Sequence, residues 1–358
     1  MLYRESGQFK VSYQSDSQIF PILQDRIGII VMLAIAVVGV PFFASEYLLN
    51  AILVPFLIFS LATLGLNFLT GYAGQLSLGS AAFMAVGAFA AYNFQLRIEG
   101  IPFIVSFILG GVCAAMVGIA FGLPSLRIKG FYLAVATLAA QFFVLWCLTK
   151  FSWFSNDSAS GVISAQPLSI FDYPINTPVS KYLLVLAIVL VLFWIGKNIV
   201  RSSTGRSWMA VRDMDVAAEV IGIPLMKTKL IAFAISSFYC GIAGVLYAFC
   251  YLGTVEPDGF SLELSFKILF MVIIGGVGSI LGNFLGAAFI LLLPIALDLT
   301  LPYISQLLHL PIAGSTVSHI QLMVFGALII FFLIVEPHGL ARLWQIAKEK
   351  LRLWPFPH

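Results

Sequence analysis

The stretch "GRSWMAVRDMDVAAEVIGIPLMKTK", residues 205–229, is charged and helix-forming, yet it lies between long apolar runs. The chain has 358 residues, of which 61% are hydrophobic and only 10% are charged. Soluble domains carry roughly a quarter charged residues. The composition therefore excludes a water-soluble globule, and residues 205–229 are expected to form a loop that a membrane protein keeps outside the lipid.

The apolar runs on both sides approach or reach the ~20 residues with which a helix crosses a bilayer. The alternating pattern of a transmembrane barrel is absent from the sequence. We therefore expect an all-α membrane protein, a bundle of about ten transmembrane helices. The predicted spans are residues 27–43, 50–69, 76–94, 102–122, 131–149, 182–196, 230–250, 265–281, 283–300 and 319–335.

The distribution of Lys and Arg predicts the orientation. With both termini in the cytoplasm, 15 of the 19 basic residues fall on the inner side and four, Arg97, Lys150, Lys181 and Lys267, on the outer side. This asymmetry satisfies the positive-inside rule. We expect a cytoplasmic N-terminal segment at 1–26, a transmembrane domain at 27–340 and a cytoplasmic tail at 341–358.

Several function classes are disfavoured by what the sequence lacks. The net charge of +3 is too small to indicate a nucleic-acid partner, and no GxxxxGK[ST] phosphate loop is present. The four cysteines lie in apolar runs without CxxC spacing, and the four histidines are scattered, so no metal site is predicted. The spans hold almost no ionisable residue of the kind that a proton-driven pump needs. We therefore expect no catalytic site, metal or cofactor on this chain.

The inner loop, residues 197–229, holds six basic and three acidic residues, and its middle predicts a short helix over 213–222. Asp213 or Asp215 is placed to cap its start, Gly222 suits a left-handed position after its end, and Pro224 prevents continuation. One side of this helix is apolar, through Val216, Ala217, Val220 and Ile221. So short a helix needs a partner surface, either lipid headgroups or a groove in a second protein.

Two glycine-rich stretches lie at the ends of predicted spans, where one span gives way to the next. "GYAGQLSLG", residues 71–79, indicates either close helix packing through small residues or a non-helical segment that lines a translocation path. "IGGVGSILGNFLGAAF", residues 274–289, repeats the theme, and its "LGAAF" resembles "LGSAAF" at 78–83. Paired interruptions of this kind indicate two related halves around a central pathway.

The longest outer loop, about residues 150–181, carries Trp153 and Phe154. Aromatic side chains at this position are typical of an interfacial belt. The alternative is that they form part of a surface for a periplasmic partner.

Four motifs carry a resemblance to a known family. The core "AAEVIG", residues 217–222, resembles the cytoplasmic coupling motif of ABC importer permeases. This core lies within the first motif, "GRSWMAVRDMDVAAEVIGI…KTKLIAFAISSFYCGIAGVLYA", which begins at residue 205. The other three motifs occur in the order expected for the family: "NFLTGYAGQLSLGSAAFMAVGAFAA" (67–91), "LPSLRIKGFYLAVATLAAQ" (123–141) and "ILFMVIIGGVGSILGNFLGAAF" (268–289). Over residues 27–340 the chain resembles the LivM-type permeases of branched-chain amino acid ABC transporters. Ser80 departs from the pattern, since much of that family has His there.

The resemblance implies a multi-pass permease of the bacterial inner membrane, in contact with lipid, that takes up leucine, isoleucine and valine. It implies a second, homologous permease of the LivH type, two cytoplasmic ATP-binding subunits that carry ATP and Mg, and a periplasmic solute-binding protein. The residues expected to couple to the ATPases are Arg212, Asp213, Asp215, Ala217, Ala218, Glu219 and Gly222. Those expected along the translocation path are Gly74, Gln75, Ser77, Gly79, Ser80, Gly278 and Asn283.

Two alternatives stay open at this stage. A charge-poor pathway also suits urea or a short amide, which related permeases transport. A stand-alone secondary transporter is the other, and it would leave the inner helix with only lipid to bind.

Overall fold

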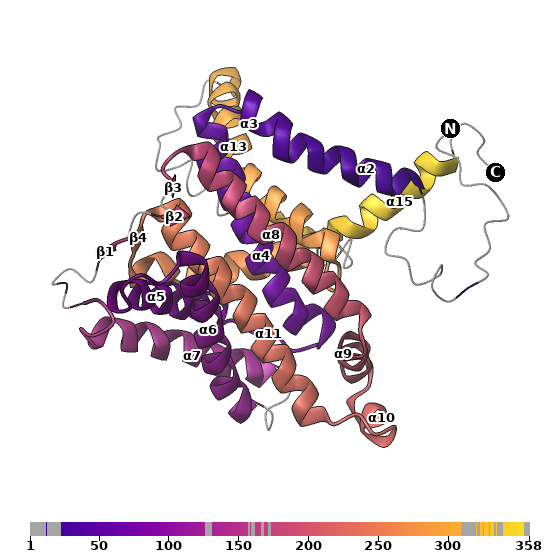
Figure 1. The fold of residues 1–358 in the computed structure, drawn as a ribbon. Coiled ribbons are helices and arrows are strands. Elements are labelled where there is room, and N and C mark those ends of the chain that lie inside the picture. The colour runs from indigo at the N-terminus through magenta and orange to yellow at the C-terminus, as the bar shows by residue number, and fades with distance from the viewer. Residues whose placement is uncertain are drawn as a thin grey trace.

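The computed structural model is a mostly helical bundle (Figure 1). It describes residues 12, 23–125, 131–156, 158, 162–165, 168–170, 173–308, 320, 323–324, 326–328, 330–332, 334 and 339–353. Within these ranges, seven helical segments are long and apolar enough to cross a membrane: Arg26–Phe43, Leu48–Tyr72, Phe103–Pro124, Tyr132–Lys150, Pro178–Arg201, Leu225–Leu252 and Ile280–Thr300. The predicted class of all-α membrane protein is consistent with these findings.

The α-helices in chain order are α2 (Leu23–Ala34), α3 (Val40–Phe43), α4 (Val54–Asn67), α5 (Ser80–Arg97), α6 (Phe103–Ser125), α7 (Phe131–Lys150), α8 (Pro178–Arg201), α9 (Ser203–Asp213), α10 (Asp215–Val220), α11 (Leu225–Leu246), α12 (Leu262–Gly275), α13 (Ile280–Leu308) and α15 (Gly339–Leu353). Short π-helical segments continue some of them, namely η1 (Ile35–Gly39), η2 (Leu48–Leu53), η3 (Phe68–Tyr72) and η4 (Tyr247–Leu252), and η5 (Pro257–Phe260) is a 3-10 turn.

The seven segments correspond to seven of the ten predicted spans. The remaining three predicted spans differ from the structure in informative ways. The predicted span 76–94 becomes α5, which begins only at Ser80 because residues 73–79 are not helical. The predicted span 265–281 was wrong at its end: α12 stops at Gly275, since Gly276 takes a φ of 119° that only glycine adopts readily. The predicted span 319–335 lies largely outside the described residues.

The core of the bundle is built on two central helices. Most residues are buried in the apolar part of the segment Leu48–Tyr72, which contains α4, and in that of Leu225–Leu252, which contains α11. In Arg26–Phe43 none is buried, and α2 extends away from the bundle (Figure 1). The sequence cannot distinguish these helices by hydropathy, because all of them are apolar; the fold places some inside and leaves others to meet lipid or a partner.

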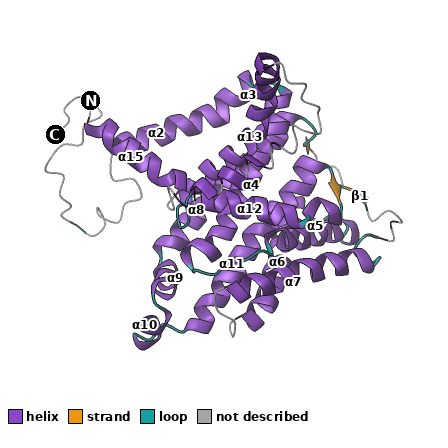
Figure 2. Cartoon of the chain, turned by 180° about the vertical axis from the view of Figure 1, so that it is seen from behind, coloured by secondary structure: helices purple, strands orange, loops and turns teal. Residues whose placement is uncertain are grey.

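The few strands mark one end of the bundle. β1 (Ile163–Ser164) pairs antiparallel with β4 (Thr254–Val255), and β2 (Ser169–Ile170) pairs with β3 (Tyr173–Pro174). Figure 2 shows these elements as a small addition to a helical structure. Because α11 starts next to α10 and leads through η4 to β4, the segment that carries β1 lies at the opposite end of the bundle from α10.

Helices α5, α6 and α11 pack backbone against backbone through facing glycines. A Cβ atom added at Gly87 of α5 would lie 2.6 Å from the Cα atom of Gly241 in α11, and one added at Gly110 of α6 would lie 2.6 Å from the carbonyl oxygen of Gly87. Neither distance is tolerable for real atoms, so no side chain fits there. Small-residue packing, which the sequence analysis weighed for residues 71–79, is thus found further along the chain, at Gly87.

We predict that Gly87→Ala destabilises the protein by about 1–3 kcal/mol through overpacking, whereas the same change at Gly28 does not. Both glycines lie within helices, but a Cβ at Gly28 meets nothing within 4 Å. Thermal unfolding of the two detergent-solubilised variants, followed by fluorescence-detected size exclusion, measures the difference. Equal melting temperatures for the two variants would contradict the packing argument.

Candidate functional site

The inner loop of the sequence folds into α9 and α10 at one end of the bundle (Figure 1). Ser202 caps α9, since its side chain accepts a hydrogen bond from the Thr204 backbone N–H at 3.2 Å. Trp208 is fully buried, its indole Nε1 donates to the Thr228 carbonyl at 3.1 Å, and its ring centroid lies 6.0 Å from that of Phe68. An aromatic side chain thus fixes α9 to both central helical segments.

Helix α10 covers Asp215–Val220, which is shorter than the predicted 213–222. The predicted carboxylate cap was wrong: the capping position is held by Met214, whose side chain makes no capping bond, while Asp213 ends α9 and Asp215 is the first residue of α10. The physical reason is the extended backbone of Met214, φ −158° and ψ 95°, which separates the two helices. Asp215 still lies in the first turn, where its charge suits the helix dipole.

The end of α10 follows the prediction. Gly222 takes a φ of 88°, its N–H donates to the Glu219 carbonyl at 3.0 Å, and the Ile223 N–H donates to the Ala218 carbonyl at 3.0 Å. These two bonds form a Schellman motif, for which glycine is favoured because a Cβ is strained in the left-handed conformation.

The apolar side of α10 is exposed in this chain. Met214 and Val216 are each 65% exposed, Val220 is 83% exposed and Ile221 is 73% exposed. Ala217 and Glu219 are exposed too, whereas Ala218 is buried. We call the set Met214, Val216, Val220 and Ile221 the α10 face. An apolar face of this kind on a short helix is stable only against another surface.

Arg212 connects this loop to the first interrupted helix. Its Nη1 donates to the Gly71 carbonyl at 2.9 Å, and its Nε donates to Asp213 Oδ1 at 2.9 Å. Gly74, with a φ of 69°, lies against the same side chain, so that a Cβ there would come within 2.7 Å of Arg212 Cγ. A small cavity of about 320 Å³ between the two segments is lined by Gly74, Gln75, Arg212, Asp213, Asp215, Lys229 and four apolar neighbours.

Residues 73–79 are not helical, so the stretch 71–79 is a broken helix between η3 and α5. A second break, at Gly276–Ser279, separates α12 from α13. Asn67, at the end of the helix that leads into the first break, bonds to the second: its Oδ1 accepts from the Gly278 N–H at 2.8 Å, and its Nδ2 donates to the Ser279 carbonyl at 3.0 Å and to Asn283 Oδ1 at 2.9 Å. The two interruptions that the sequence paired by similarity are therefore neighbours.

We call Asn67, Gly71, Arg212, Gly278 and Asn283 the polar junction. It joins the loop at residues 197–229 to both breaks, and it includes Gly278 and Asn283 from the residues expected along the path. Asn67 and Arg212 provide its hydrogen bonds, yet the sequence placed Arg212 only in the coupling set and did not select Asn67. The one signal for Asn67 was a carboxamide at the start of the quoted motif 67–91.

Of the other residues expected along the path, Ser77 and Gly79 lie in the break just before α5, and Ser80 is the first residue of α5. The backbone N–H groups there are satisfied by side chains from other helices. The Leu78 N–H donates to Thr137 Oγ1 at 2.9 Å, the Ala81 N–H donates to Ser265 Oγ at 2.9 Å, and the Ala82 N–H donates to Gln141 Oε1 at 2.6 Å. Thr137, Gln141 and Ser265 were missed by the sequence analysis, although Thr137 and Gln141 stand four residues apart in an apolar helix.

Three of the residues expected along the path carry buried side-chain atoms without a hydrogen-bond partner. Among the described residues, no hydrogen-bond partner is found for Gln75 Oε1, Ser80 Oγ or Asn283 Nδ2. Gln75 is 7% exposed, Ser80 is 1% exposed and Asn283 is fully buried. Such groups are costly without water or a ligand, which is consistent with a polar route past the breaks.

The family model described as branched-chain amino acid transport system / permease component matches residues 48–333. The chain belongs to this family. The match includes the polar junction, α9, α10 and both breaks. The quoted resemblance to the branched-chain amino acid permeases is thereby confirmed.

Individual relatives cover most of the chain. It is 27% identical to the high-affinity branched-chain amino acid transport system permease protein LivM of Escherichia coli K12, over 89% of this chain and 75% of the relative. It is 25% identical to a probable branched-chain amino acid transport permease protein LivM of Methanocaldococcus jannaschii, over 82% and 93%. It is also 26% identical to the autoinducer 2 import system permease protein LsrC of an Enterobacter species, over 52% and 53%. No solved structure matches the chain.

We predict that Asn67→Leu destabilises the protein more than Ser60→Ala does. The first change leaves the Gly278 N–H, the Ser279 carbonyl and Asn283 without their partner, at a cost of about 1–3 kcal/mol for each buried group. The Ser60 hydroxyl bonds only to the Phe56 carbonyl in its own helix, at 2.7 Å. Thermal unfolding in detergent compares them, and a melting temperature of Asn67→Leu equal to that of Ser60→Ala would contradict the role given to Asn67.

Proposed function

We propose that this chain is the membrane permease of an ATP-driven ABC importer that moves leucine, isoleucine and valine across a bacterial inner membrane. The permease has about ten spans, with both termini in the cytoplasm. It forms the pore with a second, homologous permease. Two ATP-binding subunits dock on the cytoplasmic side, and a periplasmic solute-binding protein delivers the solute.

The observation that carries this proposal is the contrast within the coupling loop. The α10 face is exposed, while the loop beneath it is fixed by the buried Trp208 and by the Arg212–Gly71 hydrogen bond. A rigidly mounted helix with an open apolar face suits a groove in a second protein. A helix that bound only to lipid headgroups would not require these fixed contacts with the bundle.

The polar junction supports a route by which movement of the ATPases reaches the pathway. A pull on α10 acts through Arg212 on Gly71, and through Asn67 on the break at Gly276–Ser279. Both breaks then move with the loop, as elements of a rigid-body rearrangement. ATP and Mg stay on the partner subunits, and this chain supplies the docking helix and the path.

The solute is proposed from the family and from the scarcity of charge along the described spans, which suits a zwitterion with an apolar side chain. The LsrC relative is a permease named for the import of a different solute, autoinducer 2. Uptake of radiolabelled leucine, compared with urea, in cells that lack the transporter and regain it on a plasmid would decide between these solutes. Uptake of urea alone would overturn the branched-chain assignment.

We predict that Val220→Asp lowers the amount of ATPase that co-purifies with the tagged chain by at least about tenfold, because a carboxylate in an apolar groove is strongly unfavourable. The measurement is gentle detergent extraction from native membranes, followed by identification of the co-purifying chains by mass spectrometry and an ATPase assay of the eluate.

The matched control is Val162→Asp. Val162 is also exposed, at 40%, but it belongs to the segment at the opposite end of the bundle from α10. It should leave ATPase recovery unchanged. If the wild-type chain comes out alone, the docking proposal fails and a stand-alone transporter becomes the better explanation.

We predict that Arg212→Gln keeps ATPase docking but lowers solute uptake per ATP hydrolysed about tenfold, the effect of one charge-assisted hydrogen bond at ~1.5 kcal/mol. Arg206→Gln is the control, since Arg206 lies on the same helix and, in the hydrogen bonds that the structure gives it, its side chain donates only to the Arg201 carbonyl, at 3.1 Å. Both ratios are measured in proteoliposomes of the full complex. An unchanged ratio in Arg212→Gln would remove the polar junction from the coupling route.

A further inference from the structure

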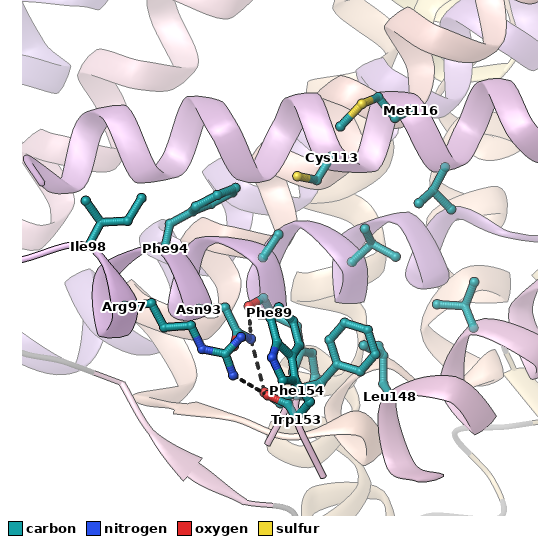
Figure 3. Close-up of a pocket in the computed structure, with 14 residues that line it drawn as sticks. Phe89, Asn93, Phe94, Arg97, Ile98, Cys113, Met116, Leu148, Trp153 and Phe154 are labelled. Atoms are coloured by element: carbon teal, nitrogen blue, oxygen red, sulfur yellow. Dashed lines mark hydrogen bonds between the residues drawn. The ribbon is translucent and has the colours of Figure 1, made fainter. Parts of the chain in front are cut away.

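A second cavity, of about 590 Å³, lies between α5, α6 and α7 (Figure 3). We call it the lateral groove. Helices α6 and α7 both pack on α5 but make few contacts with each other, which leaves the space between them open. Its volume falls within the ~300–1,000 Å³ range of small-molecule pockets. None of the residues in the coupling or pathway sets lines it.

The lateral groove is elongated and apolar along most of its length. On α5 its lining extends from Val86 to Arg97, which corresponds to about 16 Å along the helix axis at roughly 1.5 Å per residue. Across from α5, Cys113 and Met116 of α6 contribute, together with Val144 and Leu148 of α7. An acyl chain requires a groove of this shape, whereas the side chain of one amino acid fills only a part of it.

The lateral groove is polar at one end. Arg97 donates from Nη2 to the Trp153 carbonyl at 2.7 Å, and its guanidinium carbon lies 3.5 Å from the centroid of the Trp153 ring. Asn93, 7% exposed, donates from Nδ2 to the carbonyls of Phe89 and Phe154 at 2.8 and 3.1 Å. Its Oδ1 has no partner among the described residues. The two polar groups stand one helical turn apart beside Trp153 and Phe154 (Figure 3).

The charge at this end has one sign. Arg97 is the single cation among the groove's described lining residues, and that lining contains no carboxylate. A guanidinium held from one side by a carbonyl and a ring still offers N–H groups to an anion, and phosphate is the anion that its fork fits best. The buried Asn93 acceptor beside it suits a hydroxyl or ammonium donor of the same headgroup.

The surroundings also favour lipid. The faces of α6 and α7 that flank the groove carry exposed apolar side chains, among them Val112 (40%) and Met116 (57%) on α6 and Phe143 (55%) on α7. Trp153, 58% exposed at the mouth, has the amphipathic character of a residue at the membrane–water interface. The groove is thus continuous with a surface of the kind that faces acyl chains.

We propose that the lateral groove binds one anionic phospholipid, with its phosphate on Arg97, a headgroup donor on Asn93 Oδ1 and an acyl chain along α5 between α6 and α7. The site rests on the membrane placement of the chain and not on the solute it carries. A bound acyl chain there supports the packing of α6 and α7 on α5, which the protein's own side chains leave incomplete.

The first test is native mass spectrometry of the purified full chain in detergent, with phosphatidylglycerol or phosphatidylcholine added. We expect the wild type to retain one phosphatidylglycerol in preference to phosphatidylcholine. Arg97→Gln should weaken that retention about tenfold, as expected for the loss of one charge-assisted contact, and Arg97→Lys should restore part of it. Equal retention of both lipids, or full retention by Arg97→Gln, would overturn the proposal.

A second variant tests the apolar part of the groove. Ala90→Trp places a large ring in the groove and should also abolish phosphatidylglycerol retention. The controls are Lys150→Gln, which removes a cation that ends α7 outside the lining, and Ala139→Trp, which adds the same ring at an exposed site on α7. Both controls should retain the lipid. Melting temperatures identify any variant that has lost its fold. If Ala90→Trp is such a variant, the comparison of Arg97→Gln with Arg97→Lys decides whether the groove binds the lipid.

A native pair of cysteines gives an independent readout. Cys113 lines the groove and Cys147 does not, although both are half-buried thiols. In vesicles, phosphatidylglycerol should slow the reaction of Cys113 with an uncharged maleimide, relative to phosphatidylcholine, and leave Cys147 unaffected. Protection of Cys113 by added leucine in place of the lipid would reassign the groove to the solute and overturn the lipid site. Protection only in the presence of the second permease would overturn it in favour of a subunit contact.

Discussion

Backbone groups inside an apolar bundle must find hydrogen-bond partners, and this requirement governs the centre of the protein. Two helices are interrupted, at 73–79 and at 276–279, and each interruption frees N–H and carbonyl groups that a continuous helix would pair. The hydrocarbon region of a bilayer has no hydrogen-bond partners for these backbone groups. Asn67, Thr137, Gln141 and Ser265 supply partners from other helices. These side chains tie α4, α5, α7, α12 and the start of α13 into one unit.

The same requirement links the breaks to the loop at the end of the bundle. The Gly71 carbonyl, at the end of the first interrupted helix, takes its partner from Arg212, which belongs to a loop that is otherwise mounted on α11 through Trp208 and Thr228. A side chain that stabilises the fold is therefore also a contact between the loop at residues 197–229 and the interior. Beyond it, α10 keeps its apolar face exposed, and this is the surface to which the proposed function assigns a partner subunit.

Tight and loose packing coexist in this bundle. Glycines let α5, α6 and α11 approach until their backbones are in contact. The close approach gains dispersion energy, which matters in lipid because the hydrophobic effect does not drive helices together there. On the other side of α5, α6 and α7 diverge and leave the lateral groove. One helix thus presents a close-packed side to the core and an incompletely packed side to the outside, where lipid completes the surface.

The sequence by itself determined the class of protein, because composition and hydropathy depend on local residue content alone. It also identified a short helix in the loop at 197–229 and the left-handed Gly222, since a charged stretch between spans and a glycine after a short helix are local signals. It placed the two glycine-rich stretches as a related pair. The sequence indicated an interruption within 274–289 but not its position at Gly276, and the predicted span ran on to residue 281. An apolar run with glycines gives no sign of where the helix stops until the backbone angle at one residue is known.

Tertiary structure alone decided which polar groups meet. Asn67 and Gly278 are far apart in the chain, as are Leu78 and Thr137, and one sequence carries no signal for which of several polar groups in apolar surroundings will pair. Burial was equally invisible: α2 and α4 are both apolar, yet one is exposed and the other lies at the centre. Hydropathy reports the preference of a helix for an apolar environment, and only the packing of the whole chain determines whether lipid or protein provides it.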